Sequence, residues 1–168
     1  REIGAFSTQQ GDLESTENPL DVAIKGEGYF IIQPKEGEVA LSRRGDFKVD
    51  VEGQLVNGEG SLVLGEDLQP IVLPPFNDIQ ISSDGLINIK PIDAPIDAPF
   101  QLAATLGTTT AEELELEKDI NGFIKPKATT NENGEIEVAE ITANQEVQMV
   151  NNYLEKSNVN PVEELILT

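Results

Sequence analysis

Short apolar stretches, broken at regular intervals by turn-forming residues, run through most of the sequence from Leu20 onward. The stretches are rich in β-branched and aromatic residues, and glycine, proline, aspartate and asparagine separate them. They read LDVAI, YFII, FKVDV, LVN, SLVL, IVL, IQI and LINI. Short runs at this spacing are typical of strands joined by tight turns. The sequence therefore predicts a mainly β fold, a single β-rich core domain built of hairpins, with at most one or two short helices.

Tight turns are predicted where an acidic residue or asparagine precedes glycine between apolar flanks, because glycine supplies the positive φ that such turns need. These places are Glu52-Gly53, Asp84-Gly85 and Asn133-Gly134, and each is expected to close a hairpin. The first two hairpins form a weak internal repeat, FKVDVEGQLVN against IQISSDGLINI. Two hairpins of similar construction can pack face to face around one core. The residues expected to share that core are Phe47 with Ile79, Val49 with Ile81, and Leu55 with Ile87.

The second half of the sequence carries more varied patterns. The doubled unit PIDAPIDAP over residues 91–99 is predicted to be a stiff surface linker, because proline lacks the ladder donor and fixes φ. QLAATL after it indicates another strand. TTAEELELEKD is predicted to form either one short helix, capped by Thr110 with Glu113 three residues on, or an acidic loop. The alternation of Val147 and Met149 indicates a strand.

The charge balance narrows the range of partners. The chain of 168 residues has 31 acidic against 11 basic residues, a formal net charge of -20. Nucleic acid and anionic membranes are poor partners for such a surface, because binding them depends on Lys and Arg. The acidity indicates either a solvated surface or a specific basic partner. No apolar run approaches the roughly 20 residues that span a bilayer, and no secretory signal is present, so the protein is cytosolic or its export signal lies outside this stretch.

No residue set suited to catalysis stands out. The sequence has no histidine and no cysteine, which excludes imidazole and thiolate nucleophiles, disulfides and the usual zinc sites. Glycoside hydrolysis by two carboxylates is disfavoured, because no pair is distinguished and no tryptophan is available to stack on a sugar. G-E-G at residues 26–28 lacks a third glycine and indicates a turn. We therefore expect no enzymatic activity and no cofactor.

One segment has the outline of a calcium loop. TTNENGEIEVAE, residues 129–140, offers Asn131, Asn133, Gly134 and Glu140 at suitable positions. Its first position is threonine where an aspartate belongs, and Pro126 lies where a helix should enter. A plain hairpin turn is therefore favoured, with a weak ion site as the alternative.

The chain ends on a helix start. Asn160 is a good N-cap, Pro161 suits the first helical position, and Glu163 lies three residues after the cap. The sequence stops about one turn later, although an isolated helix needs about 12 to 15 residues to be marginal in water. This pattern predicts a truncated helix.

Two motifs carry a resemblance to a known family. NPLDVAIKGEGYFIIQ, followed by SRRGDFKVDVEGQLVNGEGSLVLG, resembles the opening of the core domain in flagellar rod and hook proteins. LEKSNVNPVEEL resembles the signature of that family before its C-terminal axial helix. LVLGEDLQPIVLPP and the short core are more similar to the proximal-rod type than to the distal-rod or hook type. The sequence departs from the family pattern at Ser42, at PIDAPIDAP and in the acidic residues 112–119.

The resemblance implies a domain order and a role. Residues 1–19 would be an extended lead-in from a missing N-terminal axial helix, residues 20–156 the β-rich core, and residues 157–168 the start of the C-terminal axial helix. The protein would be exported by the flagellar type III system and act as a structural subunit of the periplasm-spanning rod, transmitting torque to neighbouring axial subunits. The isolated core would be monomeric. The alternatives are a distal-rod or hook-type subunit, and an acidic extracellular β-sandwich binding module.

Within these motifs, a set of residues is expected to shape the turns and contacts of the protein. The basic doublet would form ion pairs with nearby acids on the sheet surface or contact an acidic neighbouring subunit. The asparagines of SNVNP would form a joint between core and helix, or an ordinary helix cap. The full set is Asn18, Leu20, Asp21, Gly26, Gly28, Arg43, Arg44, Gly53, Ser157, Asn158, Asn160 and Glu163.

Overall fold

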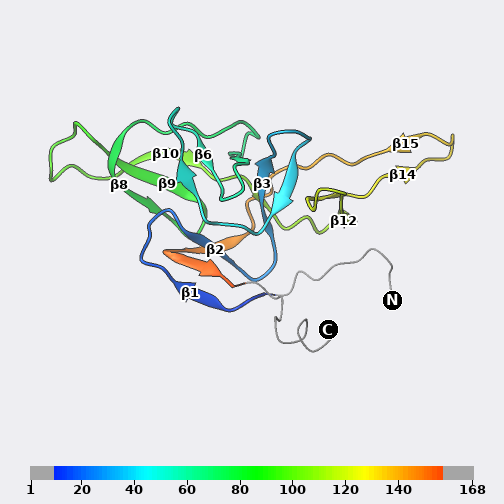
Figure 1. The fold of residues 1–168 in the computed structure, drawn as a ribbon, viewed down its shortest axis with the longest axis horizontal. Helices are drawn as coiled ribbons and strands as arrows, with labels where there is room; N and C mark the ends of the chain where they lie inside the picture. The colour runs from blue at the N-terminus through cyan, green and yellow to red at the C-terminus, as the bar shows by residue number, and fades with distance from the viewer. Residues whose placement is uncertain (1–9, 157–168) are drawn as a thin grey trace.

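The computed structural model describes residues 10–156, and over that range the chain forms strands, turns and loops without a helix (Figure 1). The mainly β prediction is confirmed. The strands are β1 (Leu13–Ser15), β2 (Val22–Lys25), β3 (Tyr29–Gln33), β4 (Ala40–Ser42), β5 (Lys48–Val49), β6 (Leu55–Val56), β7 (Leu62–Val63), β8 (Phe76–Ile81), β9 (Leu86–Pro91), β10 (Gln101–Thr105), β11 (Thr108–Thr109), β12 (Leu116–Lys118), β13 (Ile124–Pro126), β14 (Thr129–Thr130), β15 (Ile136–Glu137), β16 (Gln148–Asn151) and β17 (Tyr153–Glu155).

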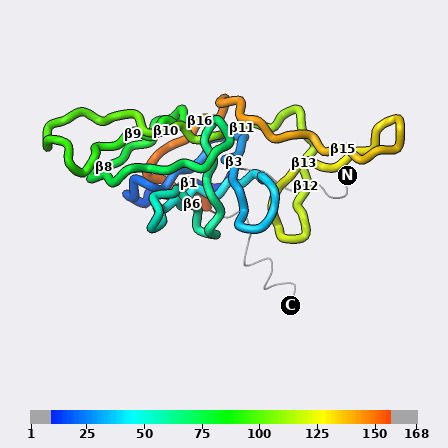
Figure 2. Tube along the Cα trace, turned by 90° about the horizontal axis from the view of Figure 1, so that it is seen from above, coloured from blue at the N-terminus to red at the C-terminus, as the bar shows by residue number. Residues whose placement is uncertain are grey.

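Antiparallel pairing joins these strands into several sheets. The largest has the order β12-β13-β4-β3-β7-β6-β5, with β11 also paired to β3. A three-stranded sheet has the order β10-β9-β8, and β1-β17, β2-β16 and β14-β15 form two-stranded ladders. The sheet of β8, β9 and β10 lies at one end of an elongated body, and the β14-β15 hairpin projects from the other end (Figures 1 and 2).

Two apolar clusters fill the body, and β3 contributes to both. Phe30 lies in the first cluster, where its ring meets that of Phe47 edge-on at 5.1 Å. Tyr29 and Ile31, on the opposite face of the strand, lie in the second cluster. Since successive side chains of a strand point to opposite sides, β3 is buried on both faces.

The repeat residues meet in the first cluster, as the sequence predicts. Phe47, Leu55, Ile79, Ile81 and Ile87 are all buried there, and Val49 packs against it half-buried. Two separate hairpins, β5-β6 and β8-β9, thus contribute to one core.

One turn design recurs in five hairpins. An Asp, Asn or Ser side-chain oxygen accepts the backbone N–H groups two and four residues later, at 2.8 to 3.3 Å. The glycine three residues later, at positive φ, donates its N–H to the carbonyl of the first residue. The first residues and their glycines are Asp50 with Gly53, Asn57 with Gly60, Ser82 with Gly85, Asp119 with Gly122, and Asn131 with Gly134. The three predicted turns are confirmed, and two further ones follow the same rule.

The helix considered for TTAEELELEKD does not form, and the segment is instead a turn followed by β12. Ala111 has a φ of 56°, which a right-handed helix does not allow, and its N–H binds the Thr109 hydroxyl oxygen at 3.0 Å. Leu114 and Leu116, two residues apart, pack against the second cluster. The period of two in LELE was the signal for a strand.

Most of the other predicted segments behave as expected. QLAATL contains β10, and β16 follows the buried Val147 and includes the buried Met149. PIDAPIDAP begins as the last residue of β9 and continues as two surface turns, in which Ala94 and Ala98 donate to the carbonyls of Pro91 and Pro95. IVL is the exception: Val72 forms one isolated β-bridge, with Gln54, in place of the expected strand.

The domain boundaries stay predictions. Within the proposed lead-in, residues 13–15 form β1, which pairs with β17 and so brings the two ends of the described chain together. The helix start around Asn160, with Ser157, Asn158 and Glu163, lies outside the described residues.

Candidate functional site

The motif N-P-L-D forms a turn that leads into β2. The Asn18 side-chain oxygen accepts the Leu20 N–H at 2.9 Å, and its carbonyl accepts the Asp21 N–H at 3.0 Å. Leu20 packs half-buried against the first cluster, while Asp21 is buried and forms a β-bridge with Asp46. The asparagine therefore fixes the direction in which the chain enters the core.

Arg43 joins two parts of the chain that are far apart in the sequence. Its Nη1 donates to the carbonyls of Gly26 and Gly28 at 2.8 and 3.0 Å. Its Nε and Nη2 donate to the two carboxylate oxygens of Glu155 at 3.0 and 2.7 Å. The side chains of Arg43 and Glu155 are only 14% and 12% exposed. This bidentate pair is the strongest form of hydrogen bond that these groups make.

Glu155 also holds the N-terminal end of the described chain. Its Oε2 accepts the Gly11 N–H and the Gln10 side-chain amide, each at 2.7 Å. The Gln10 amide oxygen in turn accepts the Gly26 N–H at 2.5 Å. We call the group formed by Gln10, Gly11, Gly26, Gly28, Arg43 and Glu155 the terminal clasp. It closes a ring of hydrogen bonds between β17, the β2-β3 turn and the segment before β1.

Asn151 ties the same region to the core. Its amide nitrogen donates to the carbonyls of Pro19 and Asp21 at 2.8 and 3.0 Å. Its amide oxygen accepts the N–H of Ile81 at 3.0 Å. One side chain thus links β16, the N-P-L-D turn and β8.

Arg44, adjacent to Arg43, lies in a different environment. It pairs with Asp46 at 2.9 Å and more loosely with Glu59 at 3.9 Å, and its side chain is 46% exposed. The hydrogen bond to Asp46 raises the pKa of the Arg44 guanidinium against the opposing effect of burial, and the charges of Asp46 and Glu59 add to the rise. Arg44 therefore fits the surface ion pair expected for the doublet, whereas Arg43 has a largely buried partner.

The structure brings together the predicted residues Gly26, Gly28 and Arg43, and places Asn18, Leu20 and Asp21 nearby through Asn151. Gly53 lies apart, in the β5-β6 turn, with a φ of 85°. Sequence reasoning missed Glu155 and Gln10 of the terminal clasp, and Asn151, which ties the clasp region to the core. Nothing marks Glu155 among 31 acidic residues, because its role depends on a partner 112 positions away.

The candidate calcium segment is the β14-β15 hairpin. The Asn131 amide oxygen accepts the N–H groups of Asn133 and Glu135, both at 2.9 Å. Its amide nitrogen donates to the carboxylates of Glu135 and Glu137 at 3.0 Å. This side chain is therefore engaged in the turn itself. Among residues 10–156, no group of three or more acidic side chains converges as a metal site would require.

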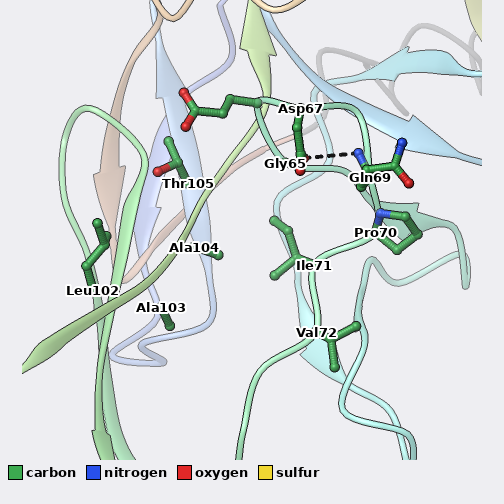
Figure 3. Close-up of a pocket in the computed structure, with 11 residues that line it drawn as sticks. Gly65, Asp67, Gln69, Pro70, Ile71, Val72, Leu102, Ala103, Ala104 and Thr105 are labelled. Atoms are coloured by element: carbon green, nitrogen blue, oxygen red, sulfur yellow. Dashed lines mark hydrogen bonds between the residues drawn. The ribbon is translucent and has the colours of Figure 1, made fainter.

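An open groove of about 510 Å³ lies between residues 65–72 and β10 (Figure 3). The two walls meet at one end, where Gly65 and Leu106 form a β-bridge and the Glu66 N–H donates to the Thr105 carbonyl at 3.1 Å. Val72 and Leu102 line the groove and are 58% and 62% exposed.

In the part of the chain that the structure describes, no helix is suited to cross a membrane.

Comparisons with known proteins point to one family. Residues 23–89 match the model of the flagellar hook protein FlgE/F/G D1 domain. The chain is 32% identical over 156 residues to the flagellar basal-body rod protein FlgF of Salmonella typhimurium. This match covers 91% of this chain and 59% of the relative. FlgF of Escherichia coli is 31% identical over 157 residues, covering 90% and 58%. The flagellar basal-body rod protein FlgG of Caulobacter vibrioides is 42% identical over 85 residues, covering 49% and 30%.

The chain thus spans about three fifths of the length of the FlgF relatives and less than a third of the FlgG relative. The match to the D1 domain runs from β2 to β9 and includes the β2-β3 turn, Arg43 and both repeat hairpins. The chain belongs to the family of flagellar rod and hook proteins.

Proposed function

We propose that this chain is the β-rich core of a structural subunit of the flagellar basal-body rod, of the proximal-rod type. The observation that carries the proposal is the similarity to FlgF over 91% of the chain, against 49% for the FlgG relative from Caulobacter vibrioides. The FlgF likeness therefore includes the region after β9.

The role proposed for the protein is mechanical. Subunits of an axial structure repeat along it through heterologous contacts, in which different surfaces of successive copies meet. A stiff body suits that task, and two features favour stiffness here. β3 is buried on both faces, and the terminal clasp ties the ends of the described chain to the β2-β3 turn. Neither feature requires a cofactor or a catalytic group.

Several parts of this proposal concern the whole protein rather than the core. We propose that the protein is exported by the flagellar type III system and is assembled into the periplasm-spanning rod, where its partners are other axial subunits. We also propose that the core alone is monomeric, because its net charge of -20 opposes self-association. A tight oligomer in light scattering at micromolar concentration would contradict this last point.

The test uses the full-length protein in its own bacterium. Basal bodies are purified, the protein is quantified by mass spectrometry, and an antibody against the core is located along the axis by gold labelling. We expect the protein in the rod and a loss of swimming when its gene is deleted. Normal swimming and absence from basal bodies would refute the proposal.

The same experiment separates the alternatives. Gold label in the distal rod or hook would replace the proximal-rod assignment, which the higher local identity to FlgG makes the natural second candidate. Release of the protein into the medium, without retention in basal bodies, would favour an extracellular binding module.

A further inference from the structure

The edge of β10 is open to a further strand. β10 is the outermost strand of the sheet β10-β9-β8, so one side of its backbone is not covered by a neighbouring strand of that sheet. Natural edge strands are usually protected by charges or proline, because an uncovered edge accepts strands from other chains. Residues 101–105 of β10 contain neither.

The opposite edge of the same sheet is protected. β8 carries Asp78, and at its last residue the Ile81 N–H donates to the Asn151 side-chain oxygen. The Met149 N–H donates to the Ser83 carbonyl at 3.1 Å just beyond the strand. Of the two edges β10 is therefore the less protected one, and its protective feature is a bulge between Leu102 and Ala104.

The groove beside β10 has the form that an extended segment requires. Its base is formed by Ile71, which is buried, and by Ala103 and Ala104, which pack against the first cluster. Val72 and Leu102 offer apolar contacts on the two walls (Figure 3). The Thr105 carbonyl is already bound by the Glu66 N–H, so a strand paired along the remaining residues 101–104 of β10 would be roughly 13 Å long.

The acidic residues of the groove favour one kind of bound segment over others. Glu66 and Asp67 line the groove near its closed end, and no basic residue lines it. A basic residue of the occupant would therefore be favoured there, whereas a second copy of this chain, with 31 acidic residues, would be repelled.

We propose that this groove binds an extended apolar segment of a different axial subunit, which adds a strand to the edge of β10 and places a lysine or arginine beside Glu66 and Asp67. This mode combines main-chain hydrogen bonds for affinity with side-chain pockets for specificity. The inference rests on the proposed function, because it supplies a contact between neighbouring rod subunits. It assigns that contact to residues 65–72 and β10.

Photo-crosslinking in the assembled rod tests the inference. The crosslinking amino acid p-benzoyl-L-phenylalanine replaces Leu102 or Val72 in the full-length protein, and Ile120 serves as the control. Ile120 is apolar and 98% exposed, and it lies in the β12-β13 turn, outside the groove. Crosslinked peptides from purified basal bodies are identified by mass spectrometry.

We expect crosslinks from positions 102 and 72 to the same short segment of another axial protein, with a lysine or arginine in that segment, and none to that segment from position 120. Crosslinks confined to the same chain, to a second copy, or to unrelated segments would overturn the proposal. If the wild-type protein is in the rod but positions 102 and 72 give no crosslink, the groove inference fails alone. Absence of the wild type from basal bodies instead refutes the proposed function, and the groove inference with it.

Substitution supplies a second, independent readout. Leu102→Asp places a charge where the occupant would bury it, and we expect at least about tenfold less protein in basal bodies than for the matched variant Ile120→Asp. Because Leu102 is 62% exposed, the variant should keep the wild-type unfolding temperature, which circular dichroism checks. Retention equal to that of Ile120→Asp would overturn the proposal.

A separate variant tests whether the negative charges of Glu66 and Asp67 are required. The double substitution of Glu66→Gln with Asp67→Asn keeps the size of both side chains and the oxygen that accepts the Gln69 N–H at 3.1 Å. We expect the crosslink yield from position 102 to fall by about threefold. An unchanged yield would overturn the basic-residue part of the proposal.

Discussion

Arg43→Ala is the sharpest test of the terminal clasp, because it removes four hydrogen bonds and one charge of a nearly buried pair. A hydrogen bond to a charged group contributes about 1.5 to 3 kcal/mol, and breaking a fully buried pair costs about 3 to 5 kcal/mol. The two side chains retain 14% and 12% exposure, so water can partly solvate the remaining carboxylate.

Two donors would also stay on Glu155 after the substitution, namely the Gly11 N–H and the Gln10 amide. These donors reduce the cost of leaving the carboxylate without its arginine. The lost hydrogen bonds to the Gly26 and Gly28 carbonyls are at the partly exposed end of the guanidinium, so their loss adds little to the cost in stability. We therefore expect the free energy of unfolding to fall by about 2 to 3 kcal/mol.

Arg44→Ala is the matched control, since it changes the neighbouring arginine in an exposed pair. We expect a cost below about 1 kcal/mol, as for other surface ion pairs. Arg43→Lys keeps the charge but loses the planar fork, so its cost should lie between those of the two alanine variants. Urea unfolding of the chain, followed by circular dichroism, measures all three.

A double-mutant cycle with Glu155→Gln isolates the pair itself. We expect a coupling energy of about 1 to 2 kcal/mol between Arg43 and Glu155. The reasoning is wrong if Arg43→Ala costs no more than Arg44→Ala, or if the coupling is indistinguishable from zero. In either case the clasp would be a surface arrangement without a structural role.

Two further predictions concern the recurrent turns. Asn57→Ala should cost about 2 kcal/mol and Asp50→Ala about 1 kcal/mol. Each substitution removes one side-chain oxygen that accepts two backbone N–H groups, but of the two residues Asn57 is fully buried and Asp50 is not. Equal urea midpoints for the two variants would contradict this. At Asp119, burial raises the pKa, but hydrogen bonds from the Phe123 N–H, Lys125 and the Asn121 N–H, with the charge of Lys125, hold it below the ordinary 3.8. The stability that this carboxylate contributes should therefore be complete above about pH 3.8 and be lost as the pH falls from there through the lower folded value. The stability difference between wild type and Asp119→Asn should shrink over that window, and a difference that is constant with pH would count against the assignment.

The hairpins and much of the core could be predicted from the sequence, because their signals are local. A polar residue before glycine marks the positive φ of a turn, and the apolar residues on either side follow the period of two. The same signal is present at Glu59-Gly60 and Asn121-Gly122, which also close hairpins. The residue that accepts the two N–H groups, such as Asp50, lies three positions before the glycine and is a further local signal of the turn.

The terminal clasp could not be predicted in the same way. Arg43 stands out as part of the basic doublet, but its partner is one of 31 acids and is brought to it by the long-range packing of β17 against β1 and β2. The pairing of β3 with β11 and the order of strands in the large sheet depend equally on long-range contacts. Side-chain patterns of single strands do not specify which strands become neighbours.

The clasp also determines how force on the ends of the described chain would enter the body. β1 and β17 are antiparallel, and the Lys156 N–H donates to the Asp12 carbonyl at 2.7 Å, so a load at either end acts at the same place. That load is shared by the β1-β17 ladder and by the pair of Arg43 with Glu155. Asn151 then connects this junction to β8, whose apolar residues lie in the first cluster. If the subunit transmits torque, a load on the ends of the described chain reaches the core through this junction. The hydrogen bonds of the junction must therefore be stiff for the core to carry part of that load.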